Sequence, residues 1–237
     1  AGDSGTLTRV PKSEVYAVIE SDLNSAISAL PAQKSTDGRA TSFTAHALLG
    51  KVYLYQGKYS EAANILEPLI GLYTLPSNPG SVFLVSGENG PESVFEIQHS
   101  KESNGWNWGW LPQSTEGNFG VIHHGIRGYN GPTYSSGWSF NVPTDEFHKA
   151  FKSGDKRRDA SILDIVKWAE DNNASYNEGY EHTGYFNNKY IPRQGYSKNT
   201  MELNYENNYR YIRYADVLLM AAEANSLTGN DTKARNY

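Results

Sequence analysis

The sequence predicts a mainly α-helical protein, in which tetratricopeptide-like helical hairpins carry a large loop-rich insertion with short strands. Three observations predict this fold class. Apolar residues recur at three- and four-residue spacing near both ends of the chain. Small and aromatic residues between positions 49 and 66 follow the spacing of a tetratricopeptide hairpin. The stretch 76–200 holds 15 of the 22 glycines and all five tryptophans, which is typical of long structured loops.

A first helix is predicted over residues 14–30. Ser13 is placed to cap it, and Pro31 ends it because proline cannot continue a helix. The apolar side chains of this segment lie at helical spacing, and they are Val15, Val18, Ile19, Leu23, Ala26, Ile27 and Leu30.

Two further helices are predicted over residues 42–56 and 60–72, as a tight antiparallel hairpin. Gly57 stands at the join, where a left-handed residue ends a helix at little cost. Small side chains let the helices approach, and larger ones fill the groove between them. The positions that match the tetratricopeptide spacing are Leu49, Gly50, Tyr53, Gly57, Tyr59, Ala62 and Leu66. An ordinary helical hairpin is the alternative interpretation.

The same pattern recurs near the C-terminus. A helix is predicted over residues 211–227, Gly229 follows it, and Ala234 stands five residues after Gly229, as Ala62 does after Gly57. The sequence stops at Tyr237, about one turn into the second arm of this hairpin. We therefore expect a fragment of a longer protein, or a partner helix supplied from elsewhere.

The insertion is expected to contain a strand over residues 93–98 and helices over 145–151 and 160–171. We interpret the whole chain, 1–237, as a single partial domain. Its parts are a helical scaffold (12–75), an aromatic, loop-rich insertion that faces a ligand (76–200) and a truncated second half-repeat (201–237).

Composition argues against several classes of function. A net charge of -5 without a basic stripe argues against nucleic-acid binding. The absence of cysteine excludes disulfides and thiol catalysis. No catalytic, cofactor-binding or spaced metal motif is found, so we predict no catalytic residue, no cofactor and no metal. The pair His123-His124 does not suit one metal ion if it lies in a strand, where neighbouring side chains point to opposite faces. A structural calcium ion held by loop oxygens stays open.

Aromatic residues make up 13% of the chain, and they suggest where a ligand binds. Trp106, Trp108 and Trp110 alternate, so an extended strand would present all three rings on one side. Indole rings stack on the apolar C–H faces of sugars, and amides such as that of Asn107 hydrogen-bond the hydroxyls. Further candidate ligand contacts lie in the following glycine-rich loop, and they are Arg127, Tyr129 and Tyr134. Burial of these rings in a loop core is the alternative, and it is the one that we favour for Trp138, Phe140 and Trp168.

Ordered blocks over most of the chain resemble the SusD/RagB family. Residues 40–57 (ATSFTAHALLGKVYLYQG) resemble its hallmark helix, and residues 92–97 (ESVFEI) resemble the strand after its middle hairpin. Residues 137–144 (GWSFNVPT) with 154–159 (GDKRRD) resemble another block, and residues 213–224 (RYADVLLMAAEA) resemble its late helix.

The resemblance implies a lipoprotein of the bacterial outer membrane, displayed on the cell surface. It implies capture of oligosaccharides or polysaccharides for a SusC-like TonB-dependent transporter, with no reaction catalysed. Family members are about twice as long, and their lipidated cysteine has no counterpart here, so a lipid anchor is expected outside this chain. A tetratricopeptide-like scaffold that binds other proteins, without a glycan site of its own, is the main alternative. A hydrolase on a helical frame is the other.

Overall fold

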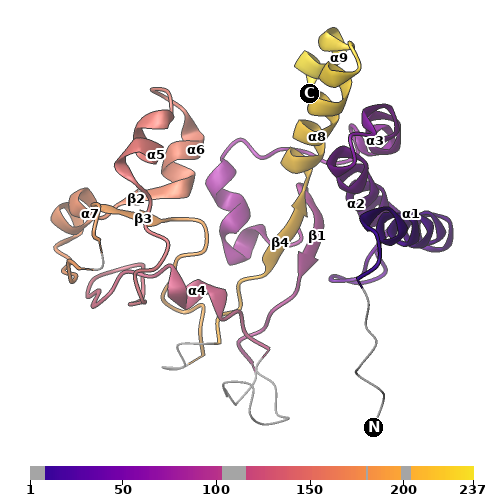
Figure 1. The fold of residues 1–237 in the computed structure, drawn as a ribbon. Helices are drawn as coiled ribbons and strands as arrows, with labels where there is room; N and C mark the ends of the chain where they lie inside the picture. Colours follow the sequence, from indigo (N-terminus) through magenta and orange to yellow (C-terminus); the bar gives the residue numbers. More distant parts are fainter. Residues whose placement is uncertain (1–8, 103–115, 180, 199–203) are drawn as a thin grey trace. The chain divides into compact units, whose positions relative to one another are not determined.

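The computed structural model describes residues 9–102, 116–179, 181–198 and 204–237. They form two compact units (Figure 1). Unit 1 comprises residues 1–74 and 212–237, and unit 2 comprises residues 75–211. The single-domain interpretation and its three sub-boundaries stay predictions.

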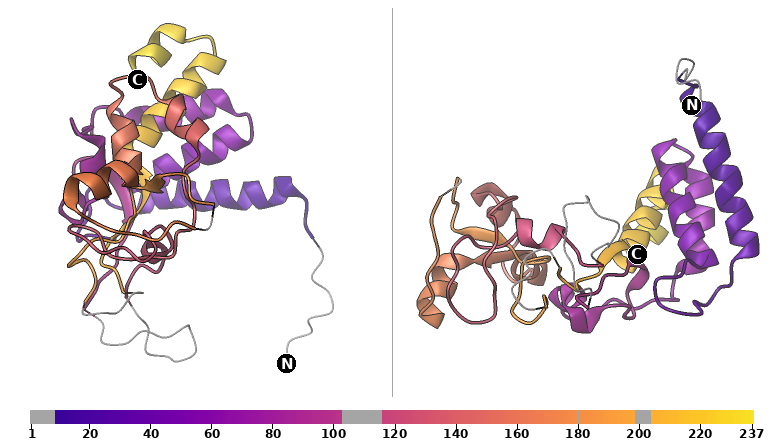
Figure 2. Two further views of the ribbon diagram at one scale, coloured as in Figure 1. Left: turned by 90° about the vertical axis from the view of Figure 1, so that its left-hand side faces the viewer. Right: turned by 90° about the horizontal axis from the view of Figure 1, so that it is seen from below.

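Unit 1 is helical. Its elements are α1 (Lys12–Ala29), α2 (Ser42–Tyr55), α3 (Tyr59–Leu66), the 3₁₀ turn η2 (Glu67–Leu69), α8 (Tyr214–Leu227) and α9 (Asp231–Asn236). Helix α1 lies beside α2, α2 packs against α3, α3 packs against α8, and α8 packs against α9 (Figure 2). These hairpins, together with the loop-rich insertion, confirm the predicted fold class.

The α2–α3 hairpin forms because small and large side chains alternate across it. Thr41 caps α2, and Thr41 and Thr44 each accept a hydrogen bond from the other's backbone amide. Gly57 joins the helices with a left-handed φ of 72°. Ala62 and Leu66 are fully buried, and Leu66 packs directly on the bare backbone of Gly50. The predicted spacing is therefore confirmed as a close helix–helix contact.

Unit 1 departs from prediction at three helix ends. Pro11, and not Ser13, stands at the N-cap of α1, where the amide that proline lacks is not needed for a helical hydrogen bond. Helix α3 ends at Leu66, and not near Leu72, because Pro68 lacks the amide that would continue it. Helix α8 begins at Tyr214, because the three preceding residues belong to a strand.

Unit 2 consists of short elements and long connections. Its 3₁₀ turns and helices are η3 (Pro79–Phe83), η4 (Val85–Gly87), α4 (Gly120–His123), α5 (Asp145–Ala150), α6 (Lys156–Ser161) and α7 (Ile165–Asn172). The strands β1 (Ser93–Ile97) and β4 (Tyr209–Arg213) pair, and β4 continues into unit 1. The strands β2 (Ile162–Asp164) and β3 (Tyr185–Asn187) pair antiparallel, with Leu163 opposite Phe186.

The predictions of β1 and α5 are confirmed, but the single helix predicted over residues 160–171 is wrong. Strand β2 interrupts it, because Ile162 and Leu163 are drawn into the core of unit 2. Asp164 then caps α7 by accepting a hydrogen bond from the amide of Lys167.

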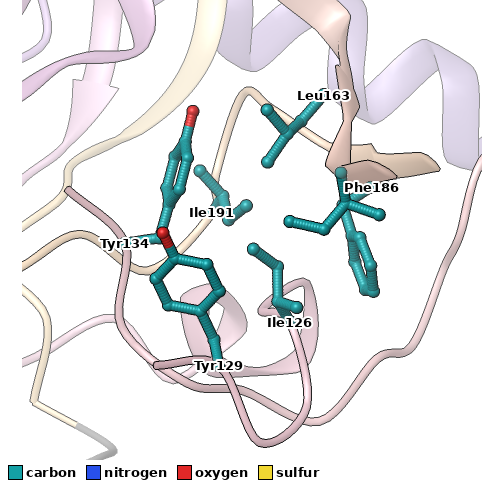
Figure 3. Packing of buried hydrophobic residues seen from close by; sticks show 7 residues of the cluster. Ile126, Tyr129, Tyr134, Leu163, Phe186 and Ile191 are labelled. Carbon is teal, nitrogen blue, oxygen red and sulfur yellow. The ribbon is translucent and has the colours of Figure 1, made fainter. Parts of the chain in front are cut away.

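One core of unit 2 gathers side chains from loops and from the β2–β3 pair (Figure 3). Trp168 of α7 packs against this core, as predicted, and its Nε1 donates to the hydroxyl of Tyr129 at 2.9 Å. The buried members are Ile126, Tyr129, Tyr134, Leu163, Ile165, Phe186 and Ile191. The hydroxyls of Tyr129 and Tyr134 keep hydrogen-bond partners, so these polar rings can be buried in the core without an unsatisfied group.

A buried charged cluster lies at the β1–β4 pair. The Arg210 side chain is 1% exposed. Its guanidinium donates to the carbonyls of Val82, Leu84 and Asn208 at 2.6–2.8 Å and to the carboxylate of Glu88 at 3.2 Å. The carboxylate of Glu96 lies 3.9 Å away. Burial raises the pKa of Glu88, against the opposing effects of the Asn208 amide and of Arg210. The cluster therefore ties η3, η4 and β4 together through one cation.

Candidate functional site

The predicted tryptophan cluster lies outside the described residues. This holds for Trp106, Asn107, Trp108 and Trp110, and their assignment as ligand contacts stays a prediction.

The described residues on either side of this segment are firmly held. The amide of Ser100 donates to the carbonyl of Glu116 at 3.0 Å, so the two flanks meet. The Lys101 ammonium donates to the Glu206 carboxylate at 2.9 Å, and its carbonyl accepts from the amide side chain of Asn204 at 2.8 Å. Asn204 is fully buried, so these contacts anchor the two flanks of the segment in the packed interior of unit 2.

Gly117, on the C-terminal flank of this segment, packs directly against the backbone of Asn204. A methyl group on Gly117 would stand 2.4 Å from the Cα of Asn204. Because this neighbour is backbone, it cannot turn aside as a flexible side chain would. We therefore expect Gly117→Ala to lower the free energy of unfolding by about 1–3 kcal/mol, as overpacking does. Urea denaturation checks this. Gly179→Ala is the control, since a methyl group there meets nothing within 4 Å. Equal stability of the two variants would contradict the close contact.

Tyr129 and Tyr134 lie in the core shown in Figure 3, and they are 8% and 4% exposed. The Tyr129 hydroxyl donates to the carbonyl of Pro132 at 2.8 Å. The guanidinium of Arg127 donates to the carbonyl of Trp138 at 2.9 Å, which braces a neighbouring loop. In this arrangement these residues have packing and bracing roles, and their assignment as ligand contacts stays a prediction.

Three aromatic rings outside the predicted set form a cluster, which we call the aromatic triad: His123, Trp138 and Phe140. Ring centroids of His123 lie 5.0 Å from Trp138 and 5.9 Å from Phe140, the latter nearly stacked at 28°. Trp138 is half-buried against the small core of Val121, Ile122 and Tyr205, whereas Phe140 is 51% exposed. The triad therefore presents an aromatic surface on a packed base.

The backbone fixes the triad. The amides of Trp138 and Phe140 donate to the carbonyls of Ile122 and His123 at 3.0 and 2.8 Å. Ser139 and Asn141, on either side of Phe140, have left-handed φ values of 59° and 55°. Such strain in non-glycine residues persists only where the surroundings enforce it, and it concentrates at functional sites. In the sequence, the Trp-x-Phe alternation in residues 138–140 is the one hint of this cluster. The exposure of Phe140, however, depends on these unusual backbone angles, which the sequence does not reveal.

The histidine pair lies at the end of α4, and not in a strand as its interpretation assumed. Burial lowers the pKa of His124, and His123 lowers it further, while a backbone hydrogen bond at Gly120 opposes the shift. In the described part of the chain, no group of three or more His, Cys, Asp or Glu side chains is placed to share a metal ion. No described helix combines the length and apolar character of a membrane span.

The lowered pKa of His124 predicts a pH dependence of stability. The unfolded imidazole has a pKa of about 6.5, above the folded value, so the unfolded chain binds more protons as the pH falls. Stability is thus full above pH 6.5 and is lost below it. We expect His124→Asn to flatten this part of the stability–pH curve, measured by urea denaturation between pH 7.5 and 5. His99→Asn should flatten it further, since burial lowers the pKa of His99 too. An unchanged slope in both variants would contradict this assignment.

Comparison with known proteins gives a consistent set of relatives. A sequence profile described as "SusD family" matches residues 159–237. "SusD-like protein P2" of Formosa agariphila is 27% identical over the whole chain, which covers 48% of that protein.

Solved structures agree. A "Laminarin binding SusD-like protein" is 40% identical, with a TM-score of 0.83 over 95% of this chain and 52% of its own. "Surface glycan-binding protein A from Bacteroides thetaiotaomicron in complex with laminarihexaose" is 27% identical, with a TM-score of 0.83 and the same coverage. The chain thus spans about half the length of these relatives. Residues 159–237 therefore match the SusD family, and the chain as a whole has the sequence likeness and the fold of SusD-like proteins.

Proposed function

We propose that unit 2 binds neutral oligosaccharides or polysaccharides, without catalysis, and that the aromatic triad is part of the contact surface. The observation that carries this proposal is the half-exposed ring of Phe140, held beside His123 and Trp138 by the strained loop. A flat apolar ring suits the C–H face of a pyranose, and fixed rings bind with little loss of side-chain freedom.

The predicted tryptophan cluster extends this proposal. The chain runs from that segment through residues 116–119 directly into α4, which carries His123. Phe119 packs on the same small core as Trp138, so the triad and the described flank of the tryptophan segment share one base. We therefore propose that Trp106, Trp108 and Trp110, with Asn107, contribute stacking and hydrogen bonds to the same glycan.

Truncation of Phe140 tests the proposal. Phe140→Ala is expected to weaken binding of laminarihexaose about tenfold, which corresponds to about 1.4 kcal/mol. An aromatic anchor at the centre of a contact surface typically loses this much or more. Isothermal titration calorimetry measures the affinity. The matched control is Phe147→Ala, since Phe147 is 49% exposed in α5 and packs on Phe151 instead.

The outcomes separate the alternatives. Equal affinity of both variants would remove the triad from the glycan site. Failure of the wild-type chain to bind laminarihexaose, laminarin or other neutral glucans would instead favour the protein-scaffold alternative.

We also propose, from the family resemblance, that the protein acts at the surface of the outer membrane and delivers glycan to a SusC-like TonB-dependent transporter. Membrane attachment is then expected through a lipid anchor outside this chain. Co-purification of such a transporter from detergent-solubilised outer membranes tests the partnership. Its absence would leave glycan binding without a delivery role.

A further inference from the structure

We propose that unit 2 carries a second saccharide site, a groove made of two adjoining cavities on either side of Asn188 and Asp159. The ligand class rests on the proposed function, but the site is separate from the aromatic triad, because the cavities have none of its residues in their lining. The cavities have volumes of about 430 and 530 Å³. Each lies within the range of small-ligand pockets, about 300–1,000 Å³. Because they share Asn188 and Asp159, they suit an extended ligand.

The cavity of about 430 Å³, which we call the first cavity, has an aromatic wall. Trp168 and Tyr134 meet edge to face with ring centroids 5.0 Å apart, and the indole Nε1 is already bonded to Tyr129. His148 of α5 also lines this cavity and stacks on Tyr185, with ring centroids 4.4 Å apart. Tyr134 is buried and supports the wall from behind, whereas the half-buried rings of Trp168 and His148 offer apolar surface of the kind that sugar rings contact.

The rim of the first cavity supplies hydrogen-bonding groups. Lys167 and Asp171 form an ion pair of 2.7 Å on α7, with side chains 70% and 57% exposed. Each keeps donor or acceptor capacity beyond that pair, since an ammonium has three hydrogens and a carboxylate accepts at two oxygens. Asp164 uses one oxygen to cap α7. The rim therefore offers donors and acceptors side by side, as vicinal hydroxyls require.

The second cavity, of about 530 Å³, adjoins the first at Asn188 and is also lined by hydrogen-bonding side chains. Its lining includes the charged side chains Lys156 and Arg193 and the small polar ones Asn78 and Ser81. The Arg193 guanidinium lies over the Tyr134 ring, 5.0 Å from its centroid, and donates to Oδ1 of the Asn188 side chain at 3.2 Å. Asn188 in turn donates to the carbonyl of Asp159 at 2.9 Å. Asn188 and Asp159, the residues shared by the two cavities, are therefore held in place before a ligand binds.

The charge of the groove favours a neutral ligand. Its lining has three carboxylates, Asp159, Asp164 and Asp171, and four cationic side chains, Lys156, Arg158, Lys167 and Arg193. Charges of the two signs nearly balance, and several pair with each other. A strongly anionic or cationic ligand would meet repulsion along part of the groove, whereas the many hydroxyls of a neutral oligosaccharide can use both signs.

The indole N–H resonance of Trp168 reports on this groove. We expect laminarihexaose to shift it in the full chain, with the resonance identified by its loss in Trp168→Phe. The double variant Lys167→Ala/Asp171→Ala should weaken this response at least fivefold in the titration midpoint. Both side chains are exposed, so the variant keeps the fold. The matched control is Asp145→Ala/Lys149→Ala, which removes another exposed i,i+4 pair, on α5.

The triad variant separates this proposal from the proposed function. If Phe140→Ala keeps the Trp168 shift and the rim variant loses it, the second site is supported. If saturating laminarihexaose shifts residues around Trp138 but leaves Trp168 unmoved, the groove is excluded and the proposed function stands. If Trp168 responds equally in the rim variant and its control, the groove is likewise excluded. If neither region responds, both proposals are overturned.

Discussion

Arg210→Met is expected to lower the free energy of unfolding by about 3–5 kcal/mol, the usual cost of removing one partner from a buried charged cluster. Methionine fills much of the volume but donates no hydrogen bond. Three backbone carbonyls then lose the guanidinium as a donor, and the carboxylate of Glu88 keeps the Asn208 amide but loses its cation. Glu96 is also left without its cation, and its side chain is 1% exposed.

Urea denaturation measures this loss. The matched control is Arg157→Met, because Arg157 pairs with Asp155 at the surface and its side chain is 74% exposed. A surface pair contributes about 1 kcal/mol or less. A loss below about 1 kcal/mol in Arg210→Met would show that water replaces the guanidinium, and that the cluster is not sealed.

Leu66→Ala is expected to cost about 2–5 kcal/mol, because it empties space in the fully buried contact between α2 and α3. Gly50→Ala fills the same space from the other side. Its methyl group would stand 2.4 Å from Cδ2 of Leu66, so overpacking of about 1–3 kcal/mol works against the better helix propensity of alanine, about 1 kcal/mol.

The double variant Gly50→Ala/Leu66→Ala tests the contact itself. The added methyl group enters the space that Leu66 leaves, so the double variant should be more stable than the sum of the single effects predicts, by about 1 kcal/mol or more. Leu219→Ala is the control, since Leu219 is 70% exposed and should change stability by about 0.5 kcal/mol or less. Strict additivity would mean that Gly50 and Leu66 do not compete for space.

The helical unit was predictable because its signals are local. The spacing of Gly50, Gly57, Ala62 and Leu66 encodes one hairpin, and the repeat near Gly229 encodes the start of another. The errors lie where distant residues decide the local structure. Ile162 and Leu163 continue a helical pattern, but pairing with β3 makes them a strand.

The candidate site was harder to predict, because exposure is a three-dimensional property. Tyr129 and Tyr134 look like display residues in a glycine-rich loop, yet distant Leu163, Phe186 and Ile191 enclose them. Phe140 looks like a core residue, yet left-handed angles at Ser139 and Asn141 turn the chain so that half of the ring meets solvent. Neither the enclosure nor these angles has a signature in the nearby sequence.

The insertion of unit 2 within unit 1 has a consequence for the order of folding. Helix α3 packs on α8, and the amide of Gly71 donates to the Tyr214 hydroxyl at 2.8 Å, although 143 positions separate them. Closing an unfolded loop of this length costs about 4 kcal/mol from its length-dependent entropy alone. If unit 2 folds first, it shortens the loop and removes most of this cost. The helical hairpins nearest the N-terminus are then expected to reach their final packing last, after the inserted unit has formed.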